Sequence, residues 1–532
     1  MEMVQISKEE YELFKAQKAL LEQQKKQIET LQERITHLEE LFVLAQKRQY
    51  GKRSEKGPMD GQVCIEGIFN EAEASAEASL PEPTLEEIVE VKAHQRKKTS
   101  LKSSLPEDLE IEEIHHQLEG EACTCSKCHS PLVEIGTDVQ EKLKIIPARY
   151  ILQRHISHHY ACRNCDEQGE TVEIKKAPFP ASVIPKSIAT AESIAYVMNE
   201  KFVMGSPLYR LEQNFARKGI HLSRQTMSNW FLRVCEDYLA PICEEMKEEL
   251  KRRDILHADE TKVQVLREDG KPAESQSRMW VYLSGKETGD PIILYDYEPD
   301  WKQERPQEYL HGYQGYLITD SYAGYHSLPE GIVNVGCWAH ARRKFVDARD
   351  AGKKTKDNTS IANKAIQDIG QLYLIEKLIQ DKPPDERKKI REEKARPRLE
   401  AFFAWLETPD ILKKGQTGKA IQYALNQRRY LENYLLDGRL EIDNNRAERA
   451  IKPFVIGRKN FLFCNTPKGA RGSAIAYSLV ETAKATGVDP YEYLVWALKQ
   501  GAELYNNGQF EEIAHLSPAT FRDQKNDATP NK

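Results

Sequence analysis

The sequence of 532 residues contains no run of about 18 apolar residues, which is the length that a helix needs to span a bilayer. Its first residues, Met1-Glu2-Met3-Val4-Gln5, lack the basic and apolar regions of a secretion signal. With 30% charged residues and a mean hydropathy of -0.65, the chain is polar overall. These features argue against an integral membrane protein, and we expect a cytoplasmic one.

Cysteine is scarce, with 10 residues in the whole chain, which argues against a disulfide framework and for a reducing compartment. Four of the cysteines form two Cys-x-x-Cys pairs, and the 33 residues from 129 to 161 separate the pairs. Two such turns present the four thiolates of a tetrahedral zinc site, with Zn–S distances of about 2.3 Å. We therefore predict a structural Zn²⁺ held by Cys125, Cys128, Cys162 and Cys165. Cys123 is an extra thiol that complicates the assignment, and four unligated buried thiols are the alternative.

The chain also lacks an excess of basic residues, since its net charge is -6. This total averages over segments of opposite sign. Residues 57–90 carry nine acidic side chains and no Lys or Arg, whereas residues 446–472 carry seven basic side chains and a single acid, Glu448. A locally basic surface around Glu448 can therefore meet DNA despite the acidic total.

The N-terminal segment, residues 1–56, has apolar residues at a seven-residue spacing, which predicts a coiled coil and a homo-oligomer formed through it. The seam consists of Phe14, Leu21, Ile28, Ile35 and Phe42, with Leu31, Leu38 and Ala45 three positions further on. A long surface helix packed on its own chain is the alternative. The segment ends in a basic box around Lys52 and Arg53, and residues 57–104 have the composition of a linker.

Composition and pattern divide the rest of the chain into seven parts. We expect a zinc-binding ribbon over 105–175, with strand-like content at 142–146 and 150–152, and a helical DNA-binding region over 176–250. The first part of an α/β catalytic core follows at 251–350, a helical insertion at 351–437, and a catalytic helix with a basic segment at 438–475. A C-terminal helical region spans 476–515, and 516–532 is expected to be a disordered tail.

Two helices are expected between Leu208 and Val234, with Ser223 capping the second, which resembles a helix-turn-helix. Arg224, Gln225, Ser228 and Asn229 would then lie near the start of a recognition helix and reach base edges. Helical hairpins are common in any α domain, so a purely structural hairpin is the alternative.

Residues 255–350 alternate between strand-like and helix-like runs. The candidate strands are Ile255–Leu266, Met279–Leu283, Ile292–Tyr297, Tyr316–Thr319 and Ile332–Val335, and Ala339–Ala348 is expected to be helical. Five strands with few helices between them, followed later by a helix carrying an acid, are compatible with a ribonuclease-H-like fold. The intervening region 351–437 reads as helices with a break at Pro383-Pro384.

Three acids stand out in this region. Asp259 lies on the first candidate strand, Asp320 follows the fourth, and Glu448 comes shortly after Asp443-Asn444-Asn445, residue types that cap helices. The alternative for Glu448 is a helical salt bridge with Lys452, worth about 0.2–0.5 kcal/mol. Glu260 is a neighbour that can be mistaken for Asp259, and an isolated acid after a strand is often only a turn residue.

Together these segments resemble the insertion-sequence-66 family of bacterial transposases. The motifs that carry the resemblance run from His257 to Thr261, from Thr319 to Tyr325, from Gly336 to Phe345, from Asp443 to Ala450, and from Arg458 to Phe463. The resemblance extends over nearly the whole chain. Lys262 and Lys452 depart from it, where Pro and Arg are expected, and neither belongs to the acidic triad.

The resemblance implies a DNA transposase of the Asp, Asp, Glu type in the bacterial cytoplasm at the nucleoid. Asp259, Asp320 and Glu448 would hold two Mg²⁺ ions, or Mn²⁺, and cut and join double-stranded DNA at the element ends and the target. Helper proteins of the same element are implied as further partners. Including the recognition-helix residues, the DNA-binding side chains expected are Arg224, Gln225, Asn229, Arg342, Arg343, Arg446, Arg449, Lys452, Arg458 and Lys459.

Two questions stay open at this point. Cys337 and His340 either support the active site or contact DNA, or they are a packed Cys and a satisfied His; without a partner pair they are not assigned as zinc ligands. Two other classes of protein compete with the transposase, namely a zinc-dependent DNA-binding regulator without catalysis and a nuclease that cuts without joining.

Overall fold

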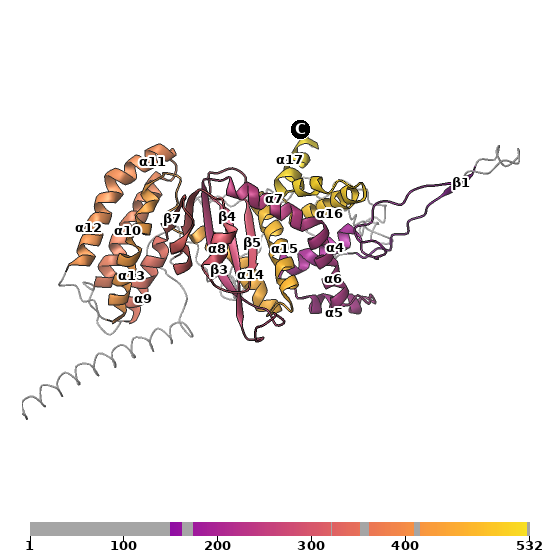
Figure 1. The fold of residues 1–532 in the computed structure, drawn as a ribbon, viewed down its shortest axis with the longest axis horizontal. Coiled ribbons are helices and arrows are strands. Elements are labelled where there is room, and N and C mark those ends of the chain that lie inside the picture. Colours follow the sequence, from indigo (N-terminus) through magenta and orange to yellow (C-terminus); the bar gives the residue numbers. More distant parts are fainter. Residues whose placement is uncertain (1–148, 162–173, 321, 352–360, 409–414, 529–532) are drawn as a thin grey trace, which may run out of the picture. The chain divides into compact units, whose positions relative to one another are not determined.

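The computed structural model describes residues 149–161, 174–320, 322–351, 361–408 and 415–528 (Figure 1). These residues belong to two compact units, which divide between Pro178 and Phe179. The expected coiled coil, the linker and the four paired cysteines lie outside the described residues. No helix in the described ranges is long and apolar enough to cross a membrane.

The smaller unit contributes a two-stranded antiparallel ribbon, β1 (His159–Ala161) and β2 (Ile174–Lys176). Ser157 Oγ donates to Ala177 O at 2.7 Å and extends the pairing. Residues 150–152, expected to have strand content, form no strand in this structure. Their side chains are exposed, 77% for Ile151 and 88% for Leu152, and no described strand pairs with them.

A helical region opens the larger unit. It comprises α4 (Ala191–Phe202), α5 (Leu208–Arg217), α6 (Arg224–Val234), the π-helical turn η4 (Cys235–Leu239) and α7 (Ala240–Lys251). The expected pair of helices is present as α5 and α6, and Ser223 caps α6 by accepting from Thr226 N–H at 3.1 Å. Gly219 in the connecting turn has φ 76°, a conformation that favours glycine.

Five strands form one mixed sheet in the order β5-β4-β3-β6-β7. They are β3 (Ile255–Gln264), β4 (Gln276–Ser284), β5 (Ile293–Glu298), β6 (Gly315–Thr319) and β7 (Ile332–Gly336). The first three along the chain pair antiparallel, whereas β6 pairs parallel to β3 and β7 parallel to β6. All five strands were expected, and their bounds differ from the predictions by at most three residues. Short helical segments, α8 (Glu304–Tyr309) and η5 (Ala323–Ser327), flank β6.

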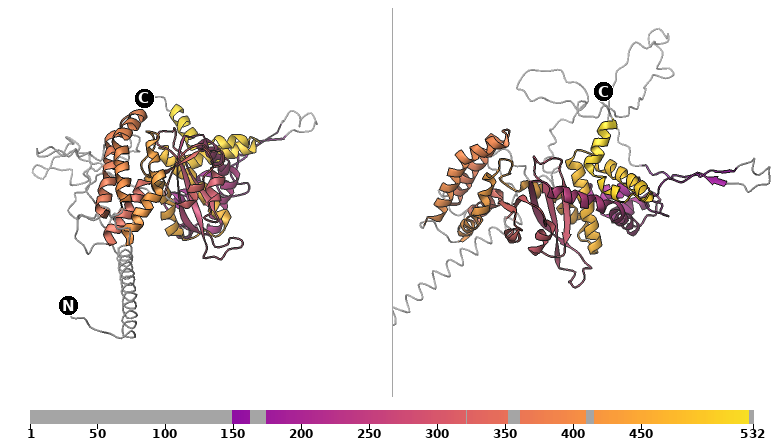
Figure 2. Two further views of the ribbon diagram at one scale, coloured as in Figure 1. Left: turned by 60° about the vertical axis from the view of Figure 1, so that its left-hand side comes forward. Right: turned by 45° about the horizontal axis from the view of Figure 1, so that its top comes forward.

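After β7 the chain forms α9 (Trp338–Ala351), which contains the expected helix, and then the helical insertion. The insertion consists of α10 (Ile361–Ile379), α11 (Pro384–Ile390), η6 (Arg391–Ala395), α12 (Arg396–Glu407), α13 (Gly415–Leu431) and η7 (Asn433–Leu435). The expected break lies between α10 and α11, where Pro384 takes the first helical position. Figure 2 shows these helices gathered beside the β7 edge of the sheet, where α13 contacts β7.

The chain then returns to the sheet with α14 (Asn445–Phe461), followed by α15 (Pro467–Ala485), α16 (Pro490–Asn506), η8 (Glu511–His515) and α17 (Pro518–Ala528). The expectation of a disordered tail over 516–532 is wrong for the described part. Phe521 of α17 packs against Trp496 with ring centroids 5.2 Å apart, and Arg522 pairs with Asp290. These contacts order a segment whose composition is mostly polar.

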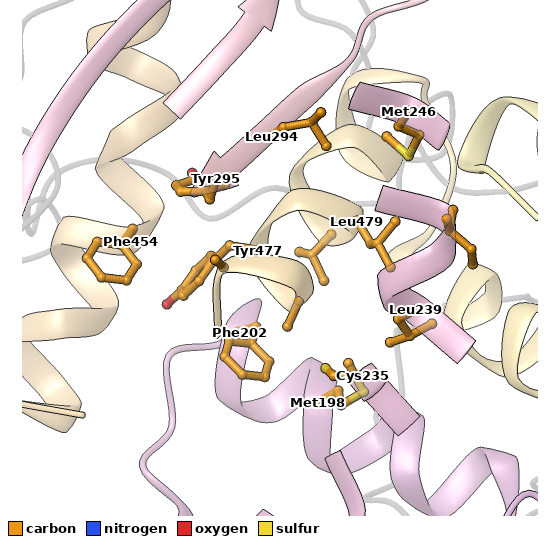
Figure 3. Close-up of a cluster of buried hydrophobic side chains, with 14 of the residues drawn as sticks. Met198, Phe202, Cys235, Leu239, Met246, Leu294, Tyr295, Phe454, Tyr477 and Leu479 are labelled. Atoms are coloured by element: carbon orange, nitrogen blue, oxygen red, sulfur yellow. The ribbon is translucent and has the colours of Figure 1, made fainter. Parts of the chain in front are cut away.

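Two hydrophobic cores hold the larger unit together. One joins the sheet to α14, α15, α16 and the helical region, and Figure 3 shows part of it, where Tyr295 of β5, Phe454 of α14 and Tyr477 of α15 converge. The second core lies among α9, the insertion helices and the other side of β6 and β7. The sheet is therefore held from both sides, which fixes the positions of the residues at its strand ends.

Candidate active site

Asp259 of β3 and Asp320, which directly follows the neighbouring parallel strand β6, lie at matching positions. His257 of β3 pairs with Ile318 of β6. Asp259 comes two residues after His257, and Asp320 comes two residues after Ile318. The two aspartates are therefore side by side at the same level of the sheet. Asp320 Oδ1 accepts from Tyr322 N–H at 2.9 Å, and Asp259 Oδ1 accepts from Glu260 N–H at 2.9 Å. The parallel pairing of β3 and β6 thus brings together two acids that are 61 residues apart in the sequence (320 minus 259).

Glu448 reaches this region from the first turn of α14, which packs on β3 and β4. The start of α14 is fixed by Asn444, whose Nδ2 donates to Ala258 O at 2.8 Å. Asn444 Oδ1 lies 3.0 Å from Nδ1 of the fully buried His257, and its backbone N–H donates to Cys337 Sγ at 3.2 Å. Asn444 occupies the N-cap position but makes no side-chain cap, because its amide is engaged by β3.

The acids influence one another electrostatically. Burial raises the pKa of Asp259 well above its usual range, and the negative charges of Glu260, Asp320 and Glu448 raise it further. Burial and the charge of Asp320 raise the pKa of Glu260 to about 8, although Trp301 Nε1 donates to its carboxylate at 3.1 Å. The cluster therefore concentrates more negative charge than its surroundings neutralise.

Glu448 also faces α9. Its Oε1 lies 3.7 Å from His340 Nδ1, and its Oε2 lies 3.4 Å from Arg343 Nη2. Both Oε1 and Nδ1 are buried and make no hydrogen bond. In the described part of the chain, only Cys337, His340 and Glu448 form a trio of metal-ligating residue types whose donor atoms all lie within 4.8 Å of one another. Asp259, Asp320 and Glu448 do not approach one another this closely.

The chemistry of Cys337 and His340 decides what this trio can do. Cys337 is buried, burial raises the pKa of its thiol, and its Sγ accepts a hydrogen bond from Asn444 N–H. Burial, followed by the charge of Arg343, lowers the pKa of His340 to about 4, so the imidazole is neutral. Cys337 is thus a packed thiol that accepts a hydrogen bond, whereas His340 has an unpaired nitrogen aimed at Glu448.

The alternative role for Glu448, an ion pair with Lys452, is not present among the described residues. Glu448 forms an ion pair with Arg343 of α9 instead, and its other oxygen lies beside the neutral His340. Burial lowers the pKa of Lys452, and the charge of Glu448 opposes that shift. Glu448 therefore belongs to the acidic cluster rather than to a local helical pair.

The expected DNA-binding residues fall into two groups. The first group lies on the two helices that meet at Glu448, and it consists of Arg342 and Arg343 of α9 and Arg446, Arg449, Lys452, Arg458 and Lys459 of α14. Arg458 is already engaged, because its Nη1 donates to Thr261 Oγ1 and Lys262 O and ties α14 to β3. Arg224, Gln225 and Asn229 are exposed on α6, where the guanidinium of Arg224 lies over the ring of Tyr209. No contact in the described residues joins this second group to the acids.

Sequence reasoning missed two supporting residues. His257 has a place in a motif but received no role, and Glu441 was not considered, although its Oε2 lies 2.7 Å from His257 Nε2. Asn444 was noted only as a capping type. The available signal was the histidine itself, two positions before Asp259 on a strand with mostly apolar neighbours, because a buried imidazole needs polar partners.

Comparisons with known proteins identify the family of this chain. The model described as "Transposase IS66 family" matches residues 186–472, that of the "zinc-finger binding domain of transposase IS66" matches 122–166, and that of "Transposase C of IS166 homeodomain" matches 37–114. The zinc-finger match covers both Cys-x-x-Cys pairs and supports a structural zinc.

Relatives of similar length occur in Sinorhizobium fredii. The uncharacterized protein y4qI is 30% identical over 92% of this chain and 90% of its own length. Protein y4hP is 28% identical over 76% of this chain and 75% of its own.

A solved structure, the Drosophila P element transposase strand transfer complex, covers 56% of this chain at 15% identity with a TM-score of 0.31. This likeness is too weak to carry an argument. The family model spans more than half of the sequence and includes the strands and helix that carry all three acids. The chain is a transposase that belongs to the IS66 family.

Proposed function

We propose that this transposase cleaves DNA at the ends of a mobile insertion sequence and transfers the strands to a target, using Asp259, Asp320 and Glu448. The observation that carries the proposal is the matched position of Asp259 and Asp320 on adjacent parallel strands, with Glu448 delivered by α14. The three acids of the proposed site come from segments far apart in the sequence and influence one another electrostatically.

A ribonuclease-H-like core is part of the proposal. Its support is the strand order β5-β4-β3-β6-β7, in which an antiparallel meander is extended by two parallel strands. The first acid lies on the central strand β3, the second follows β6, and the third lies on a helix that returns after the insertion.

Divalent metal suits the residues present. Carboxylate oxygens are the ligands that Mg²⁺ and Mn²⁺ prefer. The mutual repulsion of the buried acids and the unpaired, buried Glu448 Oε1 are features that a bound cation would relieve. We propose that Asp259, Asp320 and Glu448 would hold two ions, which supply Lewis-acid stabilisation of the attacking and leaving oxygens.

The surrounding residues would orient the DNA and the acids. Arg343 lies at Glu448 and can also meet a phosphate at the scissile site. Arg342, Arg446, Arg449, Lys452 and Lys459 on the same two helices would meet phosphates along the bound DNA, and Arg458 would support them by holding α14 on β3. We propose that Arg224, Gln225 and Asn229 on α6 read bases at a more distant part of the element end. In the zinc ribbon, Cys125, Cys128, Cys162 and Cys165 are the proposed ligands. A coiled coil over residues 1–56 would pair two chains, and helper proteins of the element would join them.

The two competing functions are less well supported. A regulator without catalysis gives no reason for the burial of several mutually repelling acids between β3, β6 and α14. A nuclease that cuts without joining uses the same site, and only an assay of strand joining separates it from a transposase.

The test is Mg²⁺-dependent cleavage and joining of duplex DNA that carries the element's own ends. We expect wild type to be active and Glu448→Gln to lose at least about 100-fold of both activities while it still binds DNA. Glu492→Gln is a matched control, because Glu492 also lies in the first turn of a helix but is far from the acids. Equal activity of wild type and Glu448→Gln would contradict the assignment, and cleavage without joining would leave the nuclease.

A further inference from the structure

The chain leaves α14 through a strained turn. Leu462, directly after the helix, has φ 68° and ψ -52°. Phe463 N–H donates to Phe461 O at 2.9 Å and closes a three-residue γ-turn, whose positive-φ form is rare and strained. Lys186 is the only other described non-glycine residue with positive φ. A leucine stays in such a conformation only where the surrounding structure holds it.

The residues on both sides of the turn are firmly anchored. Leu462 N–H donates to Arg458 O at 2.7 Å. On the other side, Cys464 N–H donates to Gln264 O at 2.9 Å, and Leu266 N–H donates to Cys464 O at 3.0 Å. The turn is therefore fixed between the end of α14 and the end of β3, so its side chains have a defined direction.

This anchored turn presents apolar side chains to solvent. Leu462 is 65% exposed and Phe463 is 42% exposed, whereas Cys464, the next residue, is buried. Met204, 65% exposed, belongs to a neighbouring loop, since Gly205 closely approaches Asn460 near the end of α14. Strain combined with exposure of two large apolar residues does not help the fold, and both features are typical of a functional contact.

The charge of α14 identifies the partner. Arg449 and Lys459 are exposed and Lys452 is half-buried, and their spacing places them on one face of the helix between Glu448 and Leu462. The row of cations begins at Glu448 and ends at the apolar residues Leu462 and Phe463. The cations are complementary to the phosphates of a DNA backbone, and apolar side chains can insert between two stacked base pairs. A lipid or protein partner would not require this row to begin at the acids.

The length of α14 sets the distance between Glu448 and Leu462. Leu462 comes 14 positions after Glu448 (462 minus 448), almost all of them within α14. At 1.5 Å per residue the two are about 21 Å apart along the axis, which corresponds to about six base pairs at 3.4 Å each.

We infer that Leu462 and Phe463 form an apolar wedge that inserts into a base step about six base pairs from the scissile phosphate. Arg449, Lys452 and Lys459 hold the intervening backbone, and the wedge unstacks and kinks the duplex so that the scissile strand enters the acidic site. This inference rests on the proposed function, because it specifies how the DNA of that reaction is distorted.

The experiment uses the full chain and duplexes that carry an element end, with 2-aminopurine placed in turn at base pairs about three to nine from the scissile phosphate. Unstacking raises the fluorescence of this base. We expect a several-fold rise near the sixth position with wild type, and loss of most of that rise with Leu462→Ala or Phe463→Ala. A full rise with both variants, or no rise at any of these positions with bound wild type, overturns the wedge.

Matched variants separate insertion from folding and from charge. Leu378→Ala removes a leucine that is 76% exposed on α10, and it should leave the signal unchanged. Leu462→Gly suits the positive φ, so it should keep or raise the melting temperature and still lose the signal. Lys459→Gln should reduce the salt dependence of DNA binding by about one ion, whereas Leu462→Ala should not. A Leu378→Ala variant that loses the signal as fully as Leu462→Ala would contradict the inference.

The outcomes distinguish this inference from the proposed function. Glu448→Gln should show the fluorescence rise without cleavage. Cleavage by wild type with no rise would overturn the wedge and leave the catalytic proposal intact. A rise with wild type in the absence of any cleavage would support the wedge and contradict the catalytic proposal.

Discussion

His257 Nδ1 lies 3.0 Å from Asn444 Oδ1, and this contact joins the strand of Asp259 to the start of the helix of Glu448. Because Asn444 Nδ2 donates to Ala258 O, its Oδ1 faces the ring as an acceptor and His257 Nδ1 donates. The other ring nitrogen lies 2.7 Å from Glu441 Oε2. Burial raises the pKa of Glu441, but the contact with His257 and the charges of Arg446 and Arg449 outweigh this and lower it.

This relationship predicts that Glu441 affects metal use without touching metal. Glu441→Gln weakens the contact that orients His257, so Asp259 and Glu448 are held less well relative to each other. We expect the Mn²⁺ concentration for half-maximal cleavage to rise by about 10-fold, as for other residues that orient metal ligands. Affinity for DNA should stay within about 2-fold, because no phosphate contact is lost.

The control for this prediction is Glu287→Gln. Glu287 also pairs with a cation, at 2.7 Å from Arg387, but it lies away from the acids. An equal increase in the Mn²⁺ requirement in both variants would show a general loss of stability and contradict the role of Glu441. His257→Gln, which keeps one donor, should be impaired further, since it cannot reach both partners.

Asp296 of β5 predicts a pH-dependent effect on stability. Burial, then the charge of Glu298, raises its pKa from 3.8 to about 7. The native state therefore binds more protons than the unfolded state between about pH 4 and pH 7, and its stability falls as pH rises through that window. Asp296→Asn removes this cost. We expect a gain on the order of 1–3 kcal/mol in the free energy of unfolding at pH 8 and little change at pH 4.

Asp300→Asn provides a control of opposite sign. A hydrogen bond from Arg305 is the largest of the effects on Asp300, and together they lower its pKa despite partial burial. The ionised Asp300 stabilises the folded protein above the ordinary pKa of an aspartate, and this stabilisation is lost as pH falls through the lowered pKa of the folded state. Asp300→Asn should therefore destabilise the protein at pH 7 and not at very low pH. Denaturant unfolding of both variants across the pH range measures the two effects. The same direction of change in both would contradict the assignments.

Local pattern was enough to predict most of the core. Strands such as β4 and β6 contain continuous apolar runs, Met279–Leu283 and Tyr316–Ile318, so their positions follow from composition. Asp320 was placed correctly because it directly follows such a strand. Glu448 was placed because helix-favouring residues follow Asp443-Asn444-Asn445, even though Asn444 proved to hold β3 rather than to cap α14.

The remaining features depend on contacts between distant residues, which a single sequence does not reveal. The link between His257, Asn444 and Cys337 joins three segments across more than 180 residues (444 minus 257 is 187). The polar composition of the last residues concealed the single aromatic, Phe521, that orders α17 against Trp496. The strain at Leu462 is likewise invisible in the sequence, because nothing in its residue type favours positive φ.

The zinc ribbon leads to a further prediction. If Cys125, Cys128, Cys162 and Cys165 hold one ion, Cys162→Ser should lower the bound zinc from about one per chain to well below half, because three ligands bind far more weakly than four. Cys464→Ser is the control, since Cys464 is a free, buried thiol in the larger unit. Elemental analysis of the purified proteins provides the measurement, and full zinc content in Cys162→Ser would exclude that residue as a ligand.

Arg391 predicts how the insertion supports the site. Its buried guanidinium donates to both oxygens of Glu376, at 2.9 and 2.6 Å, and to the carbonyls of Tyr434, Asp437 and Leu440. These bonds fix the segment that leads to Glu441 and to the start of α14. Arg391→Met leaves the Glu376 carboxylate and three carbonyls without their donor, so we expect a loss of about 3–5 kcal/mol in the free energy of unfolding.

Arg391→Lys should lose somewhat less, because it keeps the charge but not the planar set of donors. Arg396→Met is the matched control, since Arg396 pairs only with Glu392 of the preceding turn at the surface and should cost less than about 1 kcal/mol. Urea unfolding measures all three, and a similar small loss in Arg391→Met and Arg396→Met would show that the insertion is held to the core by apolar packing alone.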